Sequence, residues 1–124
     1  MFLGLAQLER VENRPGYWRL TQALTYKTRE GFKITVPKGF ITDLASIPRP
    51  LRFFFRVNGR HIEAAILHDY LYYKKGFVPF MQLSRSECDD TFYFAMLDSD
   101  VPEWKAAIMW LGVRVGGFLF FYSK

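Results

Sequence analysis

The chain has 124 residues, half of them hydrophobic and 19% aromatic, and it carries a net charge of +5. This length predicts a single domain over residues 1–124 with enough apolar residues for a core, and the modest positive charge favours anionic surfaces without choosing among them. The single cysteine, Cys88, excludes an intrachain disulfide, and an N-terminus that becomes charged too early for a secretory signal favours an intracellular protein.

The first 42 residues read as β-strands. Residues 17–28 and 32–42 are rich in Thr, Tyr, Phe, Val and Ile, and Arg29-Glu30-Gly31 between them predicts a short hairpin turn. Residues 5–11 form a further candidate strand, and Pro37-Lys38-Gly39 is expected to interrupt the strand in which it lies. The expected product is an N-terminal antiparallel sheet.

The apolar period then changes to that of helices. A first helix is expected over residues 60–75, ended by Gly76. Ser84 and Glu87 have the spacing of a capping box and open a second helix. A third is expected to begin near Pro102. The predicted fold class is α+β, with the N-terminal antiparallel sheet followed by three C-terminal helices.

The third helix is nearly all apolar, which raises the question of a membrane span. A span usually needs about 20 such residues. Arg114 falls in the middle of this run, and Gly116-Gly117 weakens the helix. We therefore expect no transmembrane span but a buried packing helix whose end docks on the sheet.

Polar residues in the first helix suggest a site. His68 and Asp69 stand in an apolar run, and burying an imidazole and a carboxylate is costly unless each finds a partner. His68 and Tyr72 are four residues apart and share a face. If the second helix returns antiparallel, it brings Asp89 near His68. A carboxylate bonded to one ring nitrogen leaves the other basic and able to activate a water.

Several other interpretations stay open. The His–Asp pair can be a purely structural link between helices, Asp43 can cap a turn, and Arg114 can neutralise a buried carboxylate, for which Asp69 is a candidate. Asp69 with backbone carbonyls could instead bind a hard cation such as Ca²⁺. A metal-phosphohydrolase site is disfavoured, because His61 and His68 lie roughly 10 Å apart along one helix. A structural zinc is disfavoured by the single cysteine.

Four ordered motifs carry a resemblance that covers almost the whole chain. They are "VPKGFITDLASIPR", "AAILHDYLY", "SRSECDDTF" and the tail "VRVGG". They resemble a family of small, uncharacterised phage and prophage proteins, the domain of unknown function family 1353. The resemblance implies a phage or prophage origin, and a location in the host cytoplasm or in the virion. It brings no activity with it.

A second, shorter resemblance concerns "AAILHDYLY" followed by "CDDTF". These segments are similar to the catalytic core of the phospholipase A-two class. By that likeness His68 is the general base, Asp89 orients it, Tyr72 supplies a supporting hydroxyl and Asp69 is a calcium ligand. The chain has no Gly-rich calcium loop of the usual kind, so only the loop with Asp43 could supply a further ligand.

Two functions follow as expectations. The first is a phage-encoded His/Asp hydrolase in which His68 activates water for attack on an ester. The second is a non-catalytic virion component, from a tail or an assembly step, or an accessory protein, in which the same residues are structural. Basic residues beside three phenylalanines suggest contact with virion proteins or an anionic lipid surface, whereas nucleic acid is a minor option. These basic residues are Arg49, Arg52, Arg56 and Arg60.

Overall fold

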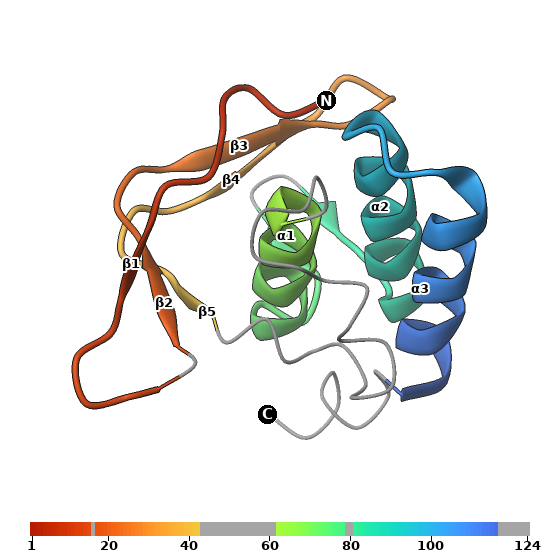
Figure 1. Cartoon of the computed structure of the whole chain (residues 1–124). Coiled ribbons are helices and arrows are strands. Elements are labelled where there is room, and N and C mark those ends of the chain that lie inside the picture. The colour runs from red at the N-terminus through yellow and green to blue at the C-terminus, as the bar shows by residue number, and fades with distance from the viewer. Residues whose placement is uncertain (16, 43–61, 79–80, 117–124) are drawn as a thin grey trace.

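The computed structural model describes residues 1–15, 17–42, 62–78 and 81–116 (Figure 1). Strands come first in the chain and three helices follow, which confirms the predicted α+β class. Some of the expected roles fall outside the described residues. These are the roles of Asp43, Arg49, Arg52, Arg56, Arg60 and His61.

The strands that precede the first helix form two antiparallel groups. In one, β1 (Leu8–Arg10) and β5 (Ile41–Thr42) both pair with β2 (Trp18–Leu20). The other is the hairpin of β3 (Leu24–Lys27) and β4 (Lys33–Val36). Along β4 the side chains alternate between exposed and buried, as expected for a strand with one face on the core.

The two longest predicted strands are each broken in two. The run over residues 17–28 separates into β2 and β3, which belong to different groups. The run over residues 32–42 separates into β4 and β5 at Gly39, whose φ of +91° suits a residue without a side chain. The backbone N–H of Gly39 donates to the Leu20 carbonyl at 2.9 Å, which fixes this corner of the chain. The hairpin turn before β4 and the break near Pro37 are confirmed.

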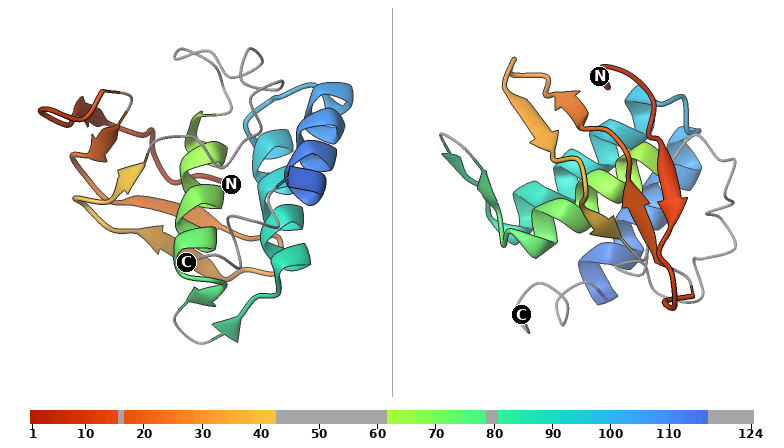
Figure 2. Two further views of the ribbon diagram at one scale, coloured as in Figure 1. Left: turned by 90° about the horizontal axis from the view of Figure 1, so that it is seen from below. Right: turned by 90° about the vertical axis from the view of Figure 1, so that its left-hand side faces the viewer.

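Three helices complete the described fold. They are α1 (Ile62–Tyr73), α2 (Arg85–Asp98) and α3 (Glu103–Gly116). Between α1 and α2 the chain makes a small hairpin of β6 (Phe77–Val78) and β7 (Met81–Gln82), so α2 returns beside α1. Figures 1 and 2 place α1 between the strands and α2, with α3 on the far side of α2.

Local signals set the helix ends. The capping box at α2 is confirmed, since Glu87 N donates to Ser84 Oγ at 3.1 Å and Ser84 N donates to Glu87 Oε1 at 2.9 Å. The first helix ends at Tyr73, two residues earlier than predicted. Lys75 and Gly76 both take positive φ angles, of 52° and 82°, and turn the chain away from the helix axis.

The third helix differs from the expectation of a buried packing helix. One side is buried against the core, through Ala106, Met109 and Val113. The opposite side carries large apolar residues that are exposed, and we return to it below. The predicted docking of its far end on the sheet concerns residues outside the described ranges. No helix among the described residues is long and apolar enough to cross a membrane.

Candidate functional site

A buried carboxylate, Asp89 of α2, lies at the centre of the helical layer and connects the three helices through hydrogen bonds. Asp89 Oδ1 lies 2.8 Å from His68 Nε2 and accepts a hydrogen bond from the Tyr72 hydroxyl at 2.5 Å. His68 and Tyr72 come from one face of α1, one turn apart, as their spacing predicted. The predicted contact between His68 and Asp89 is therefore confirmed.

The second oxygen of the same carboxylate faces two arginines. Arg114 Nη1 of α3 donates to Asp89 Oδ2 at 3.0 Å. Arg85, one turn before Asp89 on α2, places Nη1 at 3.7 Å from the same oxygen. Arg85 also donates to the carbonyls of Val113 at 3.4 Å and Arg114 at 3.1 Å, near the end of α3. We call His68, Tyr72, Arg85, Asp89 and Arg114 the Asp89 centre, and it contains groups from all three helices.

These contacts keep Asp89 ionised. Burial alone would raise the pKa of this carboxyl, but hydrogen bonds from His68, Tyr72 and Arg114 outweigh burial and lower the pKa below its usual value. The pKa of Tyr72 is raised, first by burial and then by the hydrogen bond to Asp89, so its hydroxyl keeps the proton that it donates. Both groups thus hold fixed roles, one as acceptor and one as donor.

An ionised Asp89 also decides how the imidazole is protonated. Because a carboxylate only accepts, the contact requires a proton on His68 Nε2, and the neutral ring then has its lone pair on Nδ1. His68 Nδ1 is buried and has no hydrogen-bond partner among the described residues. The ring is only 1% exposed and packs on the rings of Tyr72 and Phe92, with centroids 4.1 and 4.7 Å away. The centre therefore contains one oriented ring nitrogen, in apolar surroundings, without a hydrogen-bond partner among the described residues.

Asp69, the other acidic residue of α1, serves a different contact. Its Oδ2 accepts a hydrogen bond from the Thr42 hydroxyl at 2.6 Å, which links α1 to β5. The expectation that Arg114 would neutralise Asp69 is wrong, because Arg114 binds Asp89. Asp69 is turned away from His68 by the rotation of one helical residue and so faces the strands.

The proposed calcium ligands are only partly described. Asp69 is half-buried, and Asp43 lies outside the described residues. Within the ranges that the structure describes, no group of three or more His, Cys, Asp or Glu residues is placed to hold a metal ion. Asp90 is exposed and accepts a hydrogen bond from Trp110 Nε1 at 3.0 Å. Calcium binding therefore stays a prediction.

Two partners of the site residues were not predicted from the sequence. Arg85 stands four residues before Asp89, and this i, i+4 spacing on one helix is a signal that could have revealed the pair. Thr42 gave no comparable signal, because its contact with Asp69 spans 27 residues. Only the folded chain shows which carboxylate each donor reaches.

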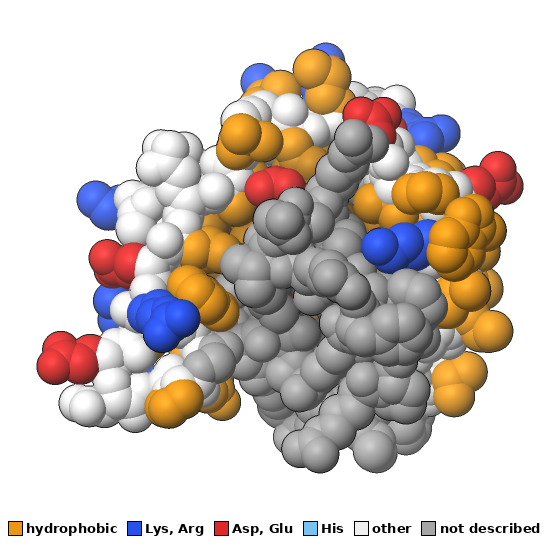
Figure 3. Space-filling model, in the orientation of Figure 1, with side chains coloured by type: hydrophobic (Ala, Val, Ile, Leu, Met, Phe, Trp, Pro, Cys, Tyr) orange, Lys and Arg blue, Asp and Glu red, His pale blue; other side chains and the backbone are white. Residues whose placement is uncertain are grey.

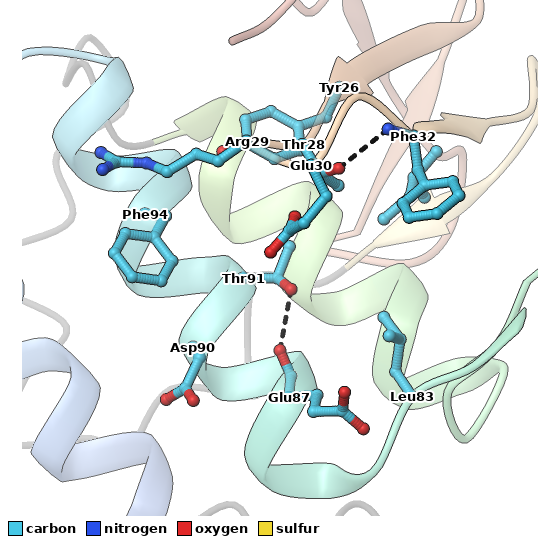
Figure 4. Close-up of a pocket in the computed structure, with 11 residues that line it drawn as sticks. Tyr26, Thr28, Arg29, Glu30, Phe32, Leu83, Glu87, Asp90, Thr91 and Phe94 are labelled. Atoms are coloured by element: carbon cyan, nitrogen blue, oxygen red, sulfur yellow. Dashed lines mark hydrogen bonds between the residues drawn. The ribbon is translucent and has the colours of Figure 1, made fainter.

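A separate pocket of about 370 Å³ lies between the β3–β4 hairpin and α2 (Figure 4). Its lining includes Phe32, Phe94 and Asp90, and the Arg29 guanidinium lies 4.5 Å above the Phe94 ring. Neither His68 nor Asp89 lines this pocket. It is therefore distinct from the Asp89 centre.

Comparisons with known proteins define the family. A model of the family described as "Protein of unknown function (DUF1353)" matches residues 18–113, so the chain belongs to this family, as its motifs predicted. The chain is 29% identical over 108 residues to an uncharacterised protein, y4jT, of Sinorhizobium fredii. That alignment covers 81% of this chain and 29% of the relative, so the chain spans under a third of the relative's length. No solved structure matches.

Proposed function

We propose that the protein is a phage-encoded hydrolase in which His68 acts as a general base on an ester substrate. One observation carries this proposal. His68 Nε2 is held by Asp89, while Nδ1 has no hydrogen-bond partner among the described residues. An imidazole oriented by a carboxylate, with its second nitrogen able to accept a proton, is the arrangement of a general base, and catalysis further requires that water reach the buried Nδ1.

The proposed reaction is hydrolysis of an ester by a water that His68 activates. Nδ1 of His68 accepts a proton from a water, and the water oxygen attacks the carbonyl carbon of the ester. The resulting imidazolium keeps its Nε2–H bonded to Asp89 and later returns the Nδ1 proton to the leaving alkoxide. Tyr72 keeps Asp89 in place through its hydroxyl. A phospholipid is the proposed substrate, and Ca²⁺ at Asp69 is the proposed accessory ion.

A second candidate, a non-catalytic virion or accessory protein, is favoured by a specific observation. The charge of Asp89 is already matched by Arg114 at 3.0 Å, and the carboxylate is fully buried. Ion pairs of this kind commonly join elements of a core without any chemistry. In this alternative the Asp89 centre fixes how the three helices pack.

The two candidate functions predict different effects of His68→Gln on activity. Glutamine keeps a hydrogen bond to Asp89 but cannot act as a base near neutral pH. The hydrolase predicts release of fatty acid from phosphatidylglycerol vesicles by the wild type, and a loss of at least a hundredfold in His68→Gln. Asp90→Asn is the matched control, because this neighbouring carboxylate is exposed, and it should keep full activity.

Calcium is tested in the same assay. Wild-type activity should fall with a chelator and return with millimolar Ca²⁺, and Asp69→Asn should remove that response. Wild-type protein that is inert on phospholipid vesicles and on simple esters, with and without Ca²⁺, would refute the hydrolase and support the structural role.

A further inference from the structure

The outer side of α3 carries a row of exposed apolar side chains. Trp104 is 62% exposed, Ile108 40%, Leu111 58% and Val115 76%. We call these four residues the α3 stripe. Figure 3 shows apolar side chains gathered over α3 at the right-hand edge of the molecule. A row of exposed apolar side chains is typical of a surface that contacts a protein or a membrane.

The stripe is not a by-product of packing the helix on its own core. Ala106, Met109 and Val113 on the opposite side are all fully buried and already anchor α3 against the rest of the domain. Successive stripe residues are separated by four, three and four positions, which is the spacing of the contact seam in paired helices. The stripe therefore has the form of a helix-pairing seam rather than that of an isolated apolar residue.

The spacing is compatible with a second copy of α3 as the partner. A four-three-four pattern reads the same in both directions, so an antiparallel copy of α3 presents the same pattern in register. Trp104 then faces Val115 of the second copy, and Ile108 faces Leu111. In each layer a stripe residue meets a stripe residue, and the largest side chain meets the smallest. A two-fold axis between residues 109 and 110 would relate the two helices, as expected for a symmetric dimer.

The residues beside the seam permit close approach. Ala107 is exposed and Gly112 is half-buried, so two small residues flank the middle of the stripe. Glu103 at the start of the helix is exposed as well, and it lies at the edge of the seam. Paired antiparallel helices also set their dipoles in opposite directions, which is favourable.

The area of the stripe limits its strength. With about 250 Å² for Trp104 and roughly 150 Å² for each of the three aliphatic side chains, the four exposed fractions supply roughly 400 Å² per copy. A stable interface buries about 800 Å² per partner. The pairing should therefore be weak and depend on concentration.

We propose that the α3 stripe is a self-association surface, on which two copies of this chain pair through antiparallel α3 helices. The proposal is independent of any activity at the Asp89 centre. The stripe does not include Arg114, whose side chain binds Asp89.

Sedimentation equilibrium over about 10–1000 µM provides the first test. The wild type should change from monomer to dimer mass across this range, and Leu111→Lys should stay monomeric. Phe77→Lys is the matched control, because Phe77 is exposed to 57% against 58% for Leu111 but lies on β6. It should associate like the wild type. A wild type that is monomeric throughout, or a Leu111→Lys variant that still dimerises, would overturn the proposal.

Cross-linking tests the antiparallel register. The native Cys88 is fully buried, so a bismaleimide reagent reaches only introduced cysteines. A mixture of Trp104→Cys and Val115→Cys chains should give cross-linked dimer, whereas either variant alone should give little. Efficient cross-linking of Trp104→Cys with itself would refute the antiparallel arrangement. Adsorption of the wild type to lipid vesicles without any self-association would assign the stripe to a membrane surface and overturn the dimer.

Discussion

Replacing Asp89 by asparagine is the sharpest test of the polar contacts in the helical layer. The substitution keeps the shape of the side chain but removes its charge and turns one acceptor oxygen into a donor. His68, Tyr72 and Arg114 all direct hydrogen-bonding groups at this carboxylate. An amide can serve either the His68 and Tyr72 side or the Arg114 side, and the other side loses its acceptor.

The expected cost follows from the exposure of the groups that are left unpaired. His68 and Tyr72 are only 1% and 2% exposed, so water cannot replace the lost bond. The Arg114 side chain is 29% exposed and can be hydrated in part. Breaking a buried ion pair costs about 3–5 kcal/mol, and the hydration of Arg114 places this case near the lower value. We expect Asp89→Asn to lower the free energy of unfolding by about 3 kcal/mol.

Urea denaturation followed by circular dichroism measures this change. The control is Asp90→Asn, because Asp90 is exposed and its carbonyl oxygen can still accept from Trp110; its change should stay within about 0.5 kcal/mol. A loss below 1 kcal/mol in Asp89→Asn would refute the reasoning, since it would mean that the carboxylate is not a required acceptor.

The difference in unfolding free energy between the wild type and Asp89→Asn should depend on pH. The pKa of Asp89 is lowered in the folded state, so its contribution to stability is present above the unfolded value of about 3.9 and is lost as pH falls through the folded pKa. The gap between the wild type and Asp89→Asn should therefore narrow as the pH drops below about 4. A gap that widens with acid would contradict the lowered pKa.

Other side chains give independent predictions. Burial raises the pKa of Cys88 to about 12, so its thiol should stay unreactive with Ellman's reagent at pH 8 until the protein is unfolded. Gly76→Ala should cost about 4 kcal/mol in urea melts, because φ is +82° and the new Cβ would collide with a backbone carbonyl. Gly39→Ala, at a similar φ in open space, should cost only about 1 kcal/mol. Tyr26→Phe removes the 2.7 Å hydrogen bond to Asp98; it should cost about 1 kcal/mol and raise the pKa of Asp98, which a carboxyl NMR titration would detect.

Local rules were enough to predict the fold class and most helix boundaries. The capping box at Ser84 and the glycine at position 76 act within a few residues of the ends that they define. The division of the N-terminal strands into two groups was not predictable in this way. It depends on hydrogen bonds such as that from Gly39 to Leu20, which join residues far apart in the chain.

The part of the candidate site that depends only on helix geometry was predictable from the sequence. The four-residue spacing of His68 and Tyr72 fixes their common face, and the return of the chain brings Asp89 to it. Whether the Arg114 guanidinium pairs with Asp69 or with Asp89 depends on how the helices are rotated against each other. That rotation is set by packing over the whole core, so the sequence left both carboxylates as candidates.

The contacts of Asp89 also bear on the order in which the domain folds. Its hydrogen-bond partners lie 17 to 25 residues away along the chain, on helices that must be docked before the carboxylate is shielded from water. Groups that reach their native contacts only after the rate-limiting step affect unfolding rates rather than folding rates. We therefore expect Asp89 to form its contacts after the rate-limiting step, so that Asp89→Asn raises the unfolding rate and leaves the folding rate nearly unchanged.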